Sequence, residues 1–319
     1  MAAYVPIIDL SARDTREGRA DLAARIGEAC ATSGFYVIVG HGVPDELVRR
    51  MWTVTDAFFR LPDAEKDLVA NRPGVSGFRR LGGSTAASID QDTPPDLCEV
   101  FAAHVTGELA DDERAELGDA WATWTLANVW PSPEFEAVWW EYMDTVGALA
   151  ADLMRLSALA LGLDEEFFAG RFDRHGSSVA ANYYYPQARP PLPGQLRRGP
   201  HTDFGGLTVL YQEDDRSGLQ VQGADGAWFD VQAIPGSFVV NIGDLMALWT
   251  GGRWVSTMHQ VVNPPPEHAG SSRVSIPFFY LPNHDAVIEP VQGPGEAVVA
   301  GEWMSRKLEK LFTGAGPRG

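Results

Sequence analysis

Three residues in the second half of the chain have the types and spacing of a metal site. His201 and Asp203 lie two positions apart in HTDFGGLTVLYQ, a segment whose composition predicts a β-strand. Side chains two apart on a strand point to the same face, so we expect the imidazole and the carboxylate to aim at one point, with Thr202 turned away. A third ligand must come from another strand, and His259 in WVSTMHQVV is the best-placed candidate.

Two histidines and one carboxylate form the facial ligand set that holds non-haem Fe(II) and leaves coordination positions open for other molecules. Two simpler interpretations stay open at this point: Asp203 as a turn-forming residue and His259 as a hydrogen-bonded core histidine. The remaining histidines end strands, flank loops or have no nearby partner, and they are His41, His104, His175, His268 and His284.

A second pair of residues suggests an anion site beside the metal. Arg273 and Ser275 are again two apart, on the next predicted strand, SRVSIPFFYLP. An arginine presents a planar fork of donors that matches a carboxylate, and a serine on the same face adds another donor. An ordinary surface salt bridge is the alternative for Arg273, but it explains poorly an arginine placed within so apolar a strand.

The segments that must position these side chains are strands. From residue 177 onward, strand-like runs alternate with turn signals such as SG, ADG, IPG and NPPP. This spacing is typical of a sandwich or a jelly roll. We therefore expect a mainly β core with peripheral helices, an α+β protein. The expected strands span 177–185, 201–212, 218–223, 227–231, 237–243, 254–262, 272–282 and 286–290.

The first half of the chain is predicted to be mostly helical. Apolar residues at helical spacing predict helices over 16–33 and from Pro44 to before Leu61, on either side of the strand FYVIVG. Residues 71–97, rich in Gly, Ser, Thr and Pro, predict a long irregular segment. A long helix is expected over 134–163, and Gly147 is a candidate interruption in it.

Composition excludes several classes of protein. The net charge of −18 argues against a nucleic-acid partner, which would require clustered Lys and Arg. No apolar run is long enough for a membrane span, and MAAYVPIIDLSARD lacks the features of a signal peptide. The only two cysteines form no metal or disulfide motif. We expect a cytoplasmic protein with one catalytic domain over 1–319; nothing in the sequence predicts its oligomeric state.

In both halves the chain resembles the Fe(II)/2-oxoglutarate-dependent dioxygenases of the isopenicillin N synthase-like family. HTDFGGLTVLYQ, SFVVNIGDLMALWTGGRWVSTMHQVV and SRVSIPFFY resemble the family core, here within 177–290. VPIIDLS, SGFYVIVGHGVP and AFFRLPDAEK resemble its N-terminal region, here within 1–105. The resemblance implies a double-stranded β-helix, or jelly roll, and a single catalytic unit.

The resemblance also assigns roles to individual residues. His201, Asp203 and His259 match the iron ligands, and Arg273 with Ser275 matches the RxS motif that binds the distal carboxylate of 2-oxoglutarate. Asn182 and Tyr184 in NYYYP match further co-substrate contacts, with a register uncertain by one residue because of the extra tyrosine. Gln260 replaces an arginine that many relatives have. The implied reaction couples decarboxylation of 2-oxoglutarate with O₂ to hydroxylation of a small molecule, or to its desaturation or ring closure.

Two other functions remain open at this stage. One is a 2-oxoglutarate-independent oxidase of the isopenicillin N synthase type, and the other is a metal-binding jelly-roll module without catalysis.

Candidate substrate contacts are Phe279, which matches an aromatic substrate residue of some relatives, and Phe204. Arg79 with Arg80, or Arg197 with Arg198, could bind an anionic substrate, or could simply be solvated. The segments 71–97, 188–200 and GEWMSRKLEKLF are expected to close the pocket.

Only three lysines accompany 22 arginines, a bias typical of GC-rich bacterial genomes, where such enzymes often modify specialised metabolites and antibiotics.

Overall fold

Two β-sheets packed face to face form the centre of the protein. The computed structural model describes residues 4–80, 94–107, 110–112, 115, 126–187, 189–213 and 218–313. The large sheet has the strand order β1 (Ile7–Asp9), β2 (Phe35–Val39), β12 (Phe238–Ile242), β9 (Leu207–Gln212), β14 (Arg273–Tyr280), β7 (Ser178–Tyr184), β5 (Glu99–His104) and β4 (Phe78–Arg79). The small sheet has the order β11 (Trp228–Asp230), β10 (Leu219–Gln222), β13 (His259–Val261) and β8 (Arg198–His201).

Nearly all neighbouring strands in both sheets are antiparallel, the exception being β1 with β2. Two short pairs lie outside the sheets: β3 (Val75–Ser76) with β6 (Ala127–Asn128), and β15 (Val287–Ile288) with β16 (Val298–Val299). The expected β core is confirmed, although the strand expected over 254–262 forms only over His259–Val261.

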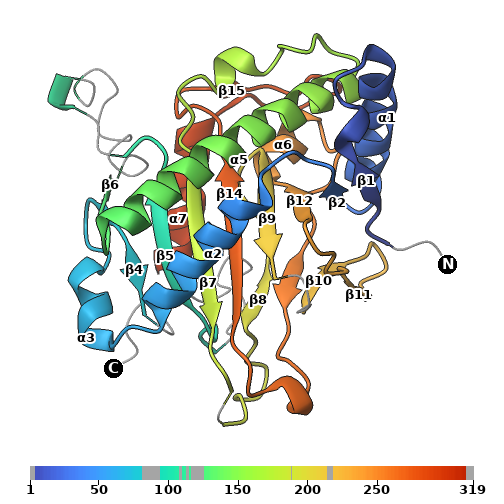
Figure 1. The fold of residues 1–319 in the computed structure, drawn as a ribbon. Helices are drawn as coiled ribbons and strands as arrows, with labels where there is room; N and C mark the ends of the chain where they lie inside the picture. The colour runs from blue at the N-terminus through green and yellow to red at the C-terminus, as the bar shows by residue number, and fades with distance from the viewer. Residues whose placement is uncertain are drawn as a thin grey trace.

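Helices cover the outer face of the large sheet (Figure 1). The long helix α5 (Pro133–Ala160) lies across this face and packs beside α1 (Arg16–Thr32) and α2 (Asp45–Phe59). The start of α5 is specified by Ser132, whose side chain accepts a hydrogen bond from the Phe135 amide, and by Pro133 in the first turn. The shorter helices are α3 (Asp63–Lys66), α6 (Asp244–Trp249) and α7 (Ala300–Thr313).

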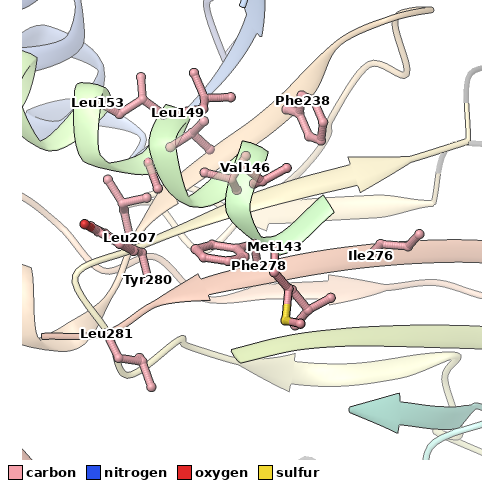
Figure 2. Close-up of a cluster of buried hydrophobic side chains, with 14 of the residues drawn as sticks. Met143, Val146, Leu149, Leu153, Leu207, Phe238, Ile276, Phe278, Tyr280 and Leu281 are labelled. Carbon is pink, nitrogen blue, oxygen red and sulfur yellow. The ribbon is translucent and has the colours of Figure 1, made fainter. Parts of the chain in front are cut away.

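Strand alternation divides the buried residues into two cores. On β14, Ile276, Phe278 and Tyr280 belong to the core under α5, and Figure 2 shows Phe278 beside Met143 of that helix. The alternate residues of β14, including Arg273 and Ser275, point instead toward the small sheet. A second core therefore lies between the sheets, formed by side chains such as Phe35, Val100, Tyr184, Leu219, Val239 and Val261.

Two expectations about the elements need correction. Gly147 does not interrupt α5, and a Cβ added there would lie 3.5 Å from the Phe278 ring, an ordinary van der Waals contact. The segment 71–97 is not wholly irregular, since it includes β3 and β4; its portion 81–93 lies outside the described residues. No helix in the described part of the chain has both the length and the apolarity needed to span a membrane.

Candidate metal centre and co-substrate pocket

His201, Asp203 and His259 converge between the two sheets. His201 ends β8, His259 begins β13, and the two residues lie opposite each other in the antiparallel pair. One ligand atom from each of the three side chains lies within 4.8 Å of the other two. The His259 Nε2 and Asp203 Oδ1 atoms are 3.9 Å apart, and the imidazole centroids are 4.2 Å apart. The convergence predicted from the sequence is confirmed.

The route to this convergence differs from the prediction. HTDFGGLTVLYQ is not one strand: β8 ends at His201, β9 begins at Leu207, and Asp203 lies on the link between the two sheets. The strand argument for a shared face of His201 and Asp203 was therefore wrong. Aspartate and paired glycines favour turns over strand continuation, and this signal was present in the sequence.

Gly205, in the link after Phe204, and Gly243, before α6, lie where two backbone segments cross at close range. A Cβ at Gly205 would lie 2.5 Å from the Leu281 side chain and 2.9 Å from the Tyr280 carbonyl oxygen. A Cβ at Gly243, the residue before α6, would lie 2.3 Å from the Gly205 carbonyl oxygen. Only glycines fit where these backbones meet, and their contact fixes the position of Asp203.

Each candidate ligand uses its other polar atom to bind the protein. The Nδ1 atoms of His201 and His259 lie 2.8 Å and 3.0 Å from the carbonyl oxygens of Gly199 and Thr257, which can only accept hydrogen bonds. Each Nδ1 therefore carries the proton, and each Nε2 keeps its lone pair for a metal.

The carboxylate is oriented in the same way. Its Oδ2 atom accepts hydrogen bonds from Thr208 Oγ1 at 2.6 Å and from Asn241 Nδ2 at 2.8 Å. Thr208 and Asn241 are cross-strand partners on β9 and β12, so the sheet presents both donors side by side. Oδ1 is left facing His259, and the donor set fits Fe(II).

Burial and neighbouring groups keep His201 and Asp203 in the protonation states that bind metal. Burial, with the nearby His259 and Arg198, lowers the pKa of His201 to about 3, so this imidazole is neutral. Burial alone would raise the pKa of Asp203, but the two imidazoles and the hydrogen bonds from Thr208 and Asn241 outweigh it and lower that pKa. The site therefore offers a neutral His201 imidazole and an anionic Asp203 carboxylate.

Arg273 and Ser275 lie on the same face of β14, deep between the sheets. Their side chains are almost fully buried, with Arg273 only 1% exposed. The Arg273 guanidinium lies 5.2 Å from the centre of the Tyr184 ring, and Tyr184 Oη is 3.4 Å from Ser275 Oγ. Asn182 Nδ2 lies 3.5 Å from the same Oγ atom. The register left open by the sequence is resolved: Asn182 and Tyr184 face the site, while Tyr183 stacks on Phe59 at the helical side.

One pocket contains the three candidate metal ligands and much of this polar cluster. It encloses about 710 Å³ of space free of protein atoms, including open solvent, and its lining includes His201, Asp203, His259, Asn182, Tyr184 and Ser275. Phe279 and Arg79 line it as expected of substrate contacts, and so does Arg198. The remaining walls are largely apolar and include Phe35, Leu210 and Leu219.

Three other candidate substrate residues lie elsewhere. Arg80 is exposed and forms ion pairs with Asp63 and Asp67. Phe204 packs edge-on against Trp303 of α7, with ring centres 6.5 Å apart. Arg197 is buried and donates to the Ser271 carbonyl oxygen. None of the three is part of the described lining of the pocket.

The expected closing segments contribute unequally. Residues 71–97 and 188–200 supply Arg79 and Arg198 to the pocket, whereas no described residue of α7 lines it. α7 contacts the start of α6 instead, where Lys307 Nζ lies 3.2 Å from Asp244 Oδ2. Sequence reasoning missed Thr208 and Asn241, which have no recognisable spacing relative to Asp203 and lie on separate strands.

Comparisons with known proteins agree with this geometry. The family described as "non-haem dioxygenase in morphine synthesis N-terminal" matches residues 5–133, and the 2OG-Fe(II) oxygenase superfamily matches residues 175–282. The validamycin A dioxygenase of Streptomyces hygroscopicus subsp. limoneus is 35% identical, over 98% of this chain and 88% of the relative. The chain belongs to the Fe(II)/2-oxoglutarate-dependent oxygenases, in the isopenicillin N synthase-like group.

Two further relatives of this oxygenase extend the comparison. Homoarginine-6-hydroxylase 2-ODD-233 of Oryza sativa subsp. japonica is 31% identical over 97% of each chain. The solved structure of JOX2 in complex with 2OG, Fe and JA superimposes with a TM-score of 0.74, at 28% identity, and the match covers 99% of this chain and 90% of that one.

The protein is thus a non-haem dioxygenase that uses Fe(II) and 2-oxoglutarate to oxidise small molecules. The match to the 2OG-Fe(II) oxygenase superfamily and the similarity to JOX2 solved with 2OG and Fe favour this activity over the 2-oxoglutarate-independent oxidase and the non-catalytic module. The jelly-roll core with peripheral helices expected from the sequence is confirmed.

Proposed function

We propose that this oxygenase hydroxylates a small organic molecule at an Fe(II) ion bound by His201, Asp203 and His259. The observation that carries the assignment is the convergence of their three ligand atoms within 4.8 Å. Hydrogen bonds to the protein occupy the other polar atom of each side chain. Such second contacts fix ligand orientation and are typical of metal sites.

The same proposal assigns 2-oxoglutarate to the polar cluster on β14 and β7. Arg273 and Ser275 bind the distal carboxylate, and Tyr184 and Asn182 hold the serine hydroxyl in place. A buried guanidinium is a strong carboxylate ligand because its hydrogen bonds are charge-assisted and poorly screened by water. Fe(II) held by His201, Asp203 and His259 would supply the O₂ chemistry that couples decarboxylation of 2-oxoglutarate to oxidation of the substrate.

The protein itself positions the reactants and excludes water from the pocket. Phe35, Leu210 and Phe279 supply apolar walls around the metal-binding residues, which limits competing reactions with solvent. The hydroxylase named among the relatives supports hydroxylation as the outcome. The Streptomyces relative and the arginine-rich composition support a role in bacterial specialised metabolism.

Spectroscopy of the anaerobic protein tests both assignments. With Fe(II) bound, 2-oxoglutarate should produce a weak charge-transfer band in the visible, and Arg273→Gln should require much higher 2-oxoglutarate for the same band. Asp203→Ala should abolish the band by removing a metal ligand. Far-UV circular dichroism of both variants checks that they fold. A wild-type protein that binds Fe(II) but develops no band would contradict the 2-oxoglutarate assignment.

A further inference from the structure

The pocket contains a positive charge without a described counter-ion. Its charged lining residues are Arg79, Arg198 and Asp203. Arg198 has Asp96 as a partner at 3.3 Å, and Asp203 faces the metal centre. Arg79 has no ion pair within the portion of the chain that the structure describes, although it is partly buried. Burial and the like charge of Arg198 both lower its pKa, so the site penalises this charge as it stands.

Arg79 lies in the same cross-strand row as the co-substrate residues but at its far end. Arg79 on β4 is opposite Val100 on β5, Val100 is opposite Asn182 on β7, and Asn182 is opposite Ser275 on β14. Strands lie about 4.8 Å apart, so roughly 14 Å of sheet separates Arg79 from Ser275. Arg79 therefore lies three strand spacings from Ser275, at the opposite end of this row from the residues proposed to bind the 2-oxoglutarate carboxylate.

With Fe(II) and 2-oxoglutarate bound, the charges expected in the site balance without Arg79. Fe(II) and 2-oxoglutarate carry opposite double charges, Asp203 is balanced by Arg273, and Asp96 by Arg198. Among the described lining residues, Arg79 is then the one positive charge that remains. An unpaired, partly desolvated guanidinium is costly, and a bound anion would remove that cost.

We propose that the substrate is an organic acid with one carboxylate, which Arg79 binds, and an apolar body, which lies against the walls formed by Phe35, Leu210 and Phe279. This rests on the proposed function, because it places the acid beside the metal and the co-substrate. Arg79 is then a specificity-determining residue. The net charge of −18 repels anions at long range, so a local cation is what selects them.

Pairs of a carboxylic acid and its amide test this proposal, because the two members of a pair share an apolar body and differ in the charge of the head group. The probes are pairs such as phenylacetate with phenylacetamide and octanoate with octanamide, titrated calorimetrically into anaerobic protein saturated with Fe(II) and 2-oxoglutarate. A charge-assisted hydrogen bond is worth about 1.5–3 kcal/mol, so acids should bind roughly 10- to 100-fold more tightly than their amides. Arg79→Gln should abolish this preference and leave 2-oxoglutarate affinity unchanged.

Arg80→Gln is the matched control, because Arg80 is adjacent in sequence but pairs with Asp63 and Asp67 outside the described pocket lining. This variant should keep the wild-type preference for acids. Equal binding of acids and amides, binding of neither, or a preference that survives Arg79→Gln would overturn the proposal. Failure of the proposed function is a separate result, since it would appear as lost 2-oxoglutarate binding in the wild-type protein.

Discussion

Among single residues, the proposed iron site depends on side chains outside the three proposed ligands. Thr208 and Asn241 both donate to Oδ2 of Asp203, and the two histidines donate Nδ1 protons to backbone carbonyls. These contacts select one oxygen and two nitrogens as ligands before any metal arrives. Preorganisation of this kind lowers the entropic cost of binding.

Thr208→Val should therefore weaken Fe(II) binding while leaving all three ligands in place. The substitution removes a 2.6 Å hydrogen bond to Asp203 and keeps the volume and β-branching of the side chain. We expect a loss of about 10- to 100-fold in Fe(II) affinity, measured by anaerobic titration. Thr55→Val, at a buried threonine on α2, is the control and should bind Fe(II) as the wild type does. Equal affinity in both variants would show that the hydroxyl does not orient Asp203.

Among the secondary-structure elements, the link between β8 and β9 crosses the start of α6, and this crossing determines the position of Asp203. The amide of Asp244 donates to the Asp203 carbonyl oxygen at 2.8 Å, and that of Leu245 donates to Phe204 at 3.1 Å. The same contact brings Gly243 against Gly205. Sheet and helix are thus joined at the backbone of a metal ligand.

Gly243→Ala should disturb both stability and metal binding. The new Cβ would lie 2.3 Å from a backbone oxygen, which cannot move without shifting Asp203. Overpacking of this kind costs about 1–3 kcal/mol, so thermal unfolding of the variant should occur several degrees lower and Fe(II) affinity should fall. Gly170→Ala is the control, because no atom lies within 4 Å of its added Cβ. Wild-type behaviour of Gly243→Ala would refute the crossing as the determinant of Asp203 position.

A buried ionic cluster attaches α3 to the edge of the large sheet. Lys66 Nζ lies 2.7 Å from Glu99 Oε2, which also accepts from the Tyr185 hydroxyl at 2.6 Å. Both charged side chains are less than a tenth exposed. No local pattern indicates this pairing, because the two residues belong to separate segments of the chain.

Lys66→Met should leave a buried, uncompensated carboxylate and cost about 3–5 kcal/mol of unfolding free energy. Urea denaturation measures this loss. In a Glu99→Gln background the same substitution should cost clearly less, because the glutamine carries no charge. Equal losses in the two backgrounds would mean that Lys66 contributes through packing alone.

For the molecule as a whole, buried histidines outside the metal site make stability depend on pH. Burial lowers the pKa of His41, His175 and His284. Around His41, Asp45 opposes this effect and Arg13 adds to it, while Asp285 and Glu302 oppose it at His284. Below the ordinary histidine pKa the unfolded chain binds protons that the folded protein does not, so the free energy of unfolding should fall as pH drops below about 6.5.

His175→Phe isolates one part of this dependence. His175 packs beside the Tyr280 ring, with centroids 5.1 Å apart, and burial is the only cause of its lowered pKa. In metal-free protein, the unfolding free energy of the variant should fall less steeply between pH 6.5 and 5 than that of the wild type, by at most about 1.4 kcal/mol per pH unit. Parallel curves would show that His175 titrates alike in both states.

Local sequence patterns were enough to predict which residue types form the candidate site and that a β core is covered by helices. Alternation in SRVSIPFFY placed Arg273 and Ser275 on one face, and the helices over 16–33 and 134–163 followed from apolar spacing, because both signals are local. Long-range packing was needed to establish that Asp203 reaches the site from a turn, that Thr208 and Asn241 hold it, and that Arg79 enters the pocket while Arg80 does not. These outcomes depend on strand neighbours distant in sequence, since cross-strand register and backbone crossings have no local signature.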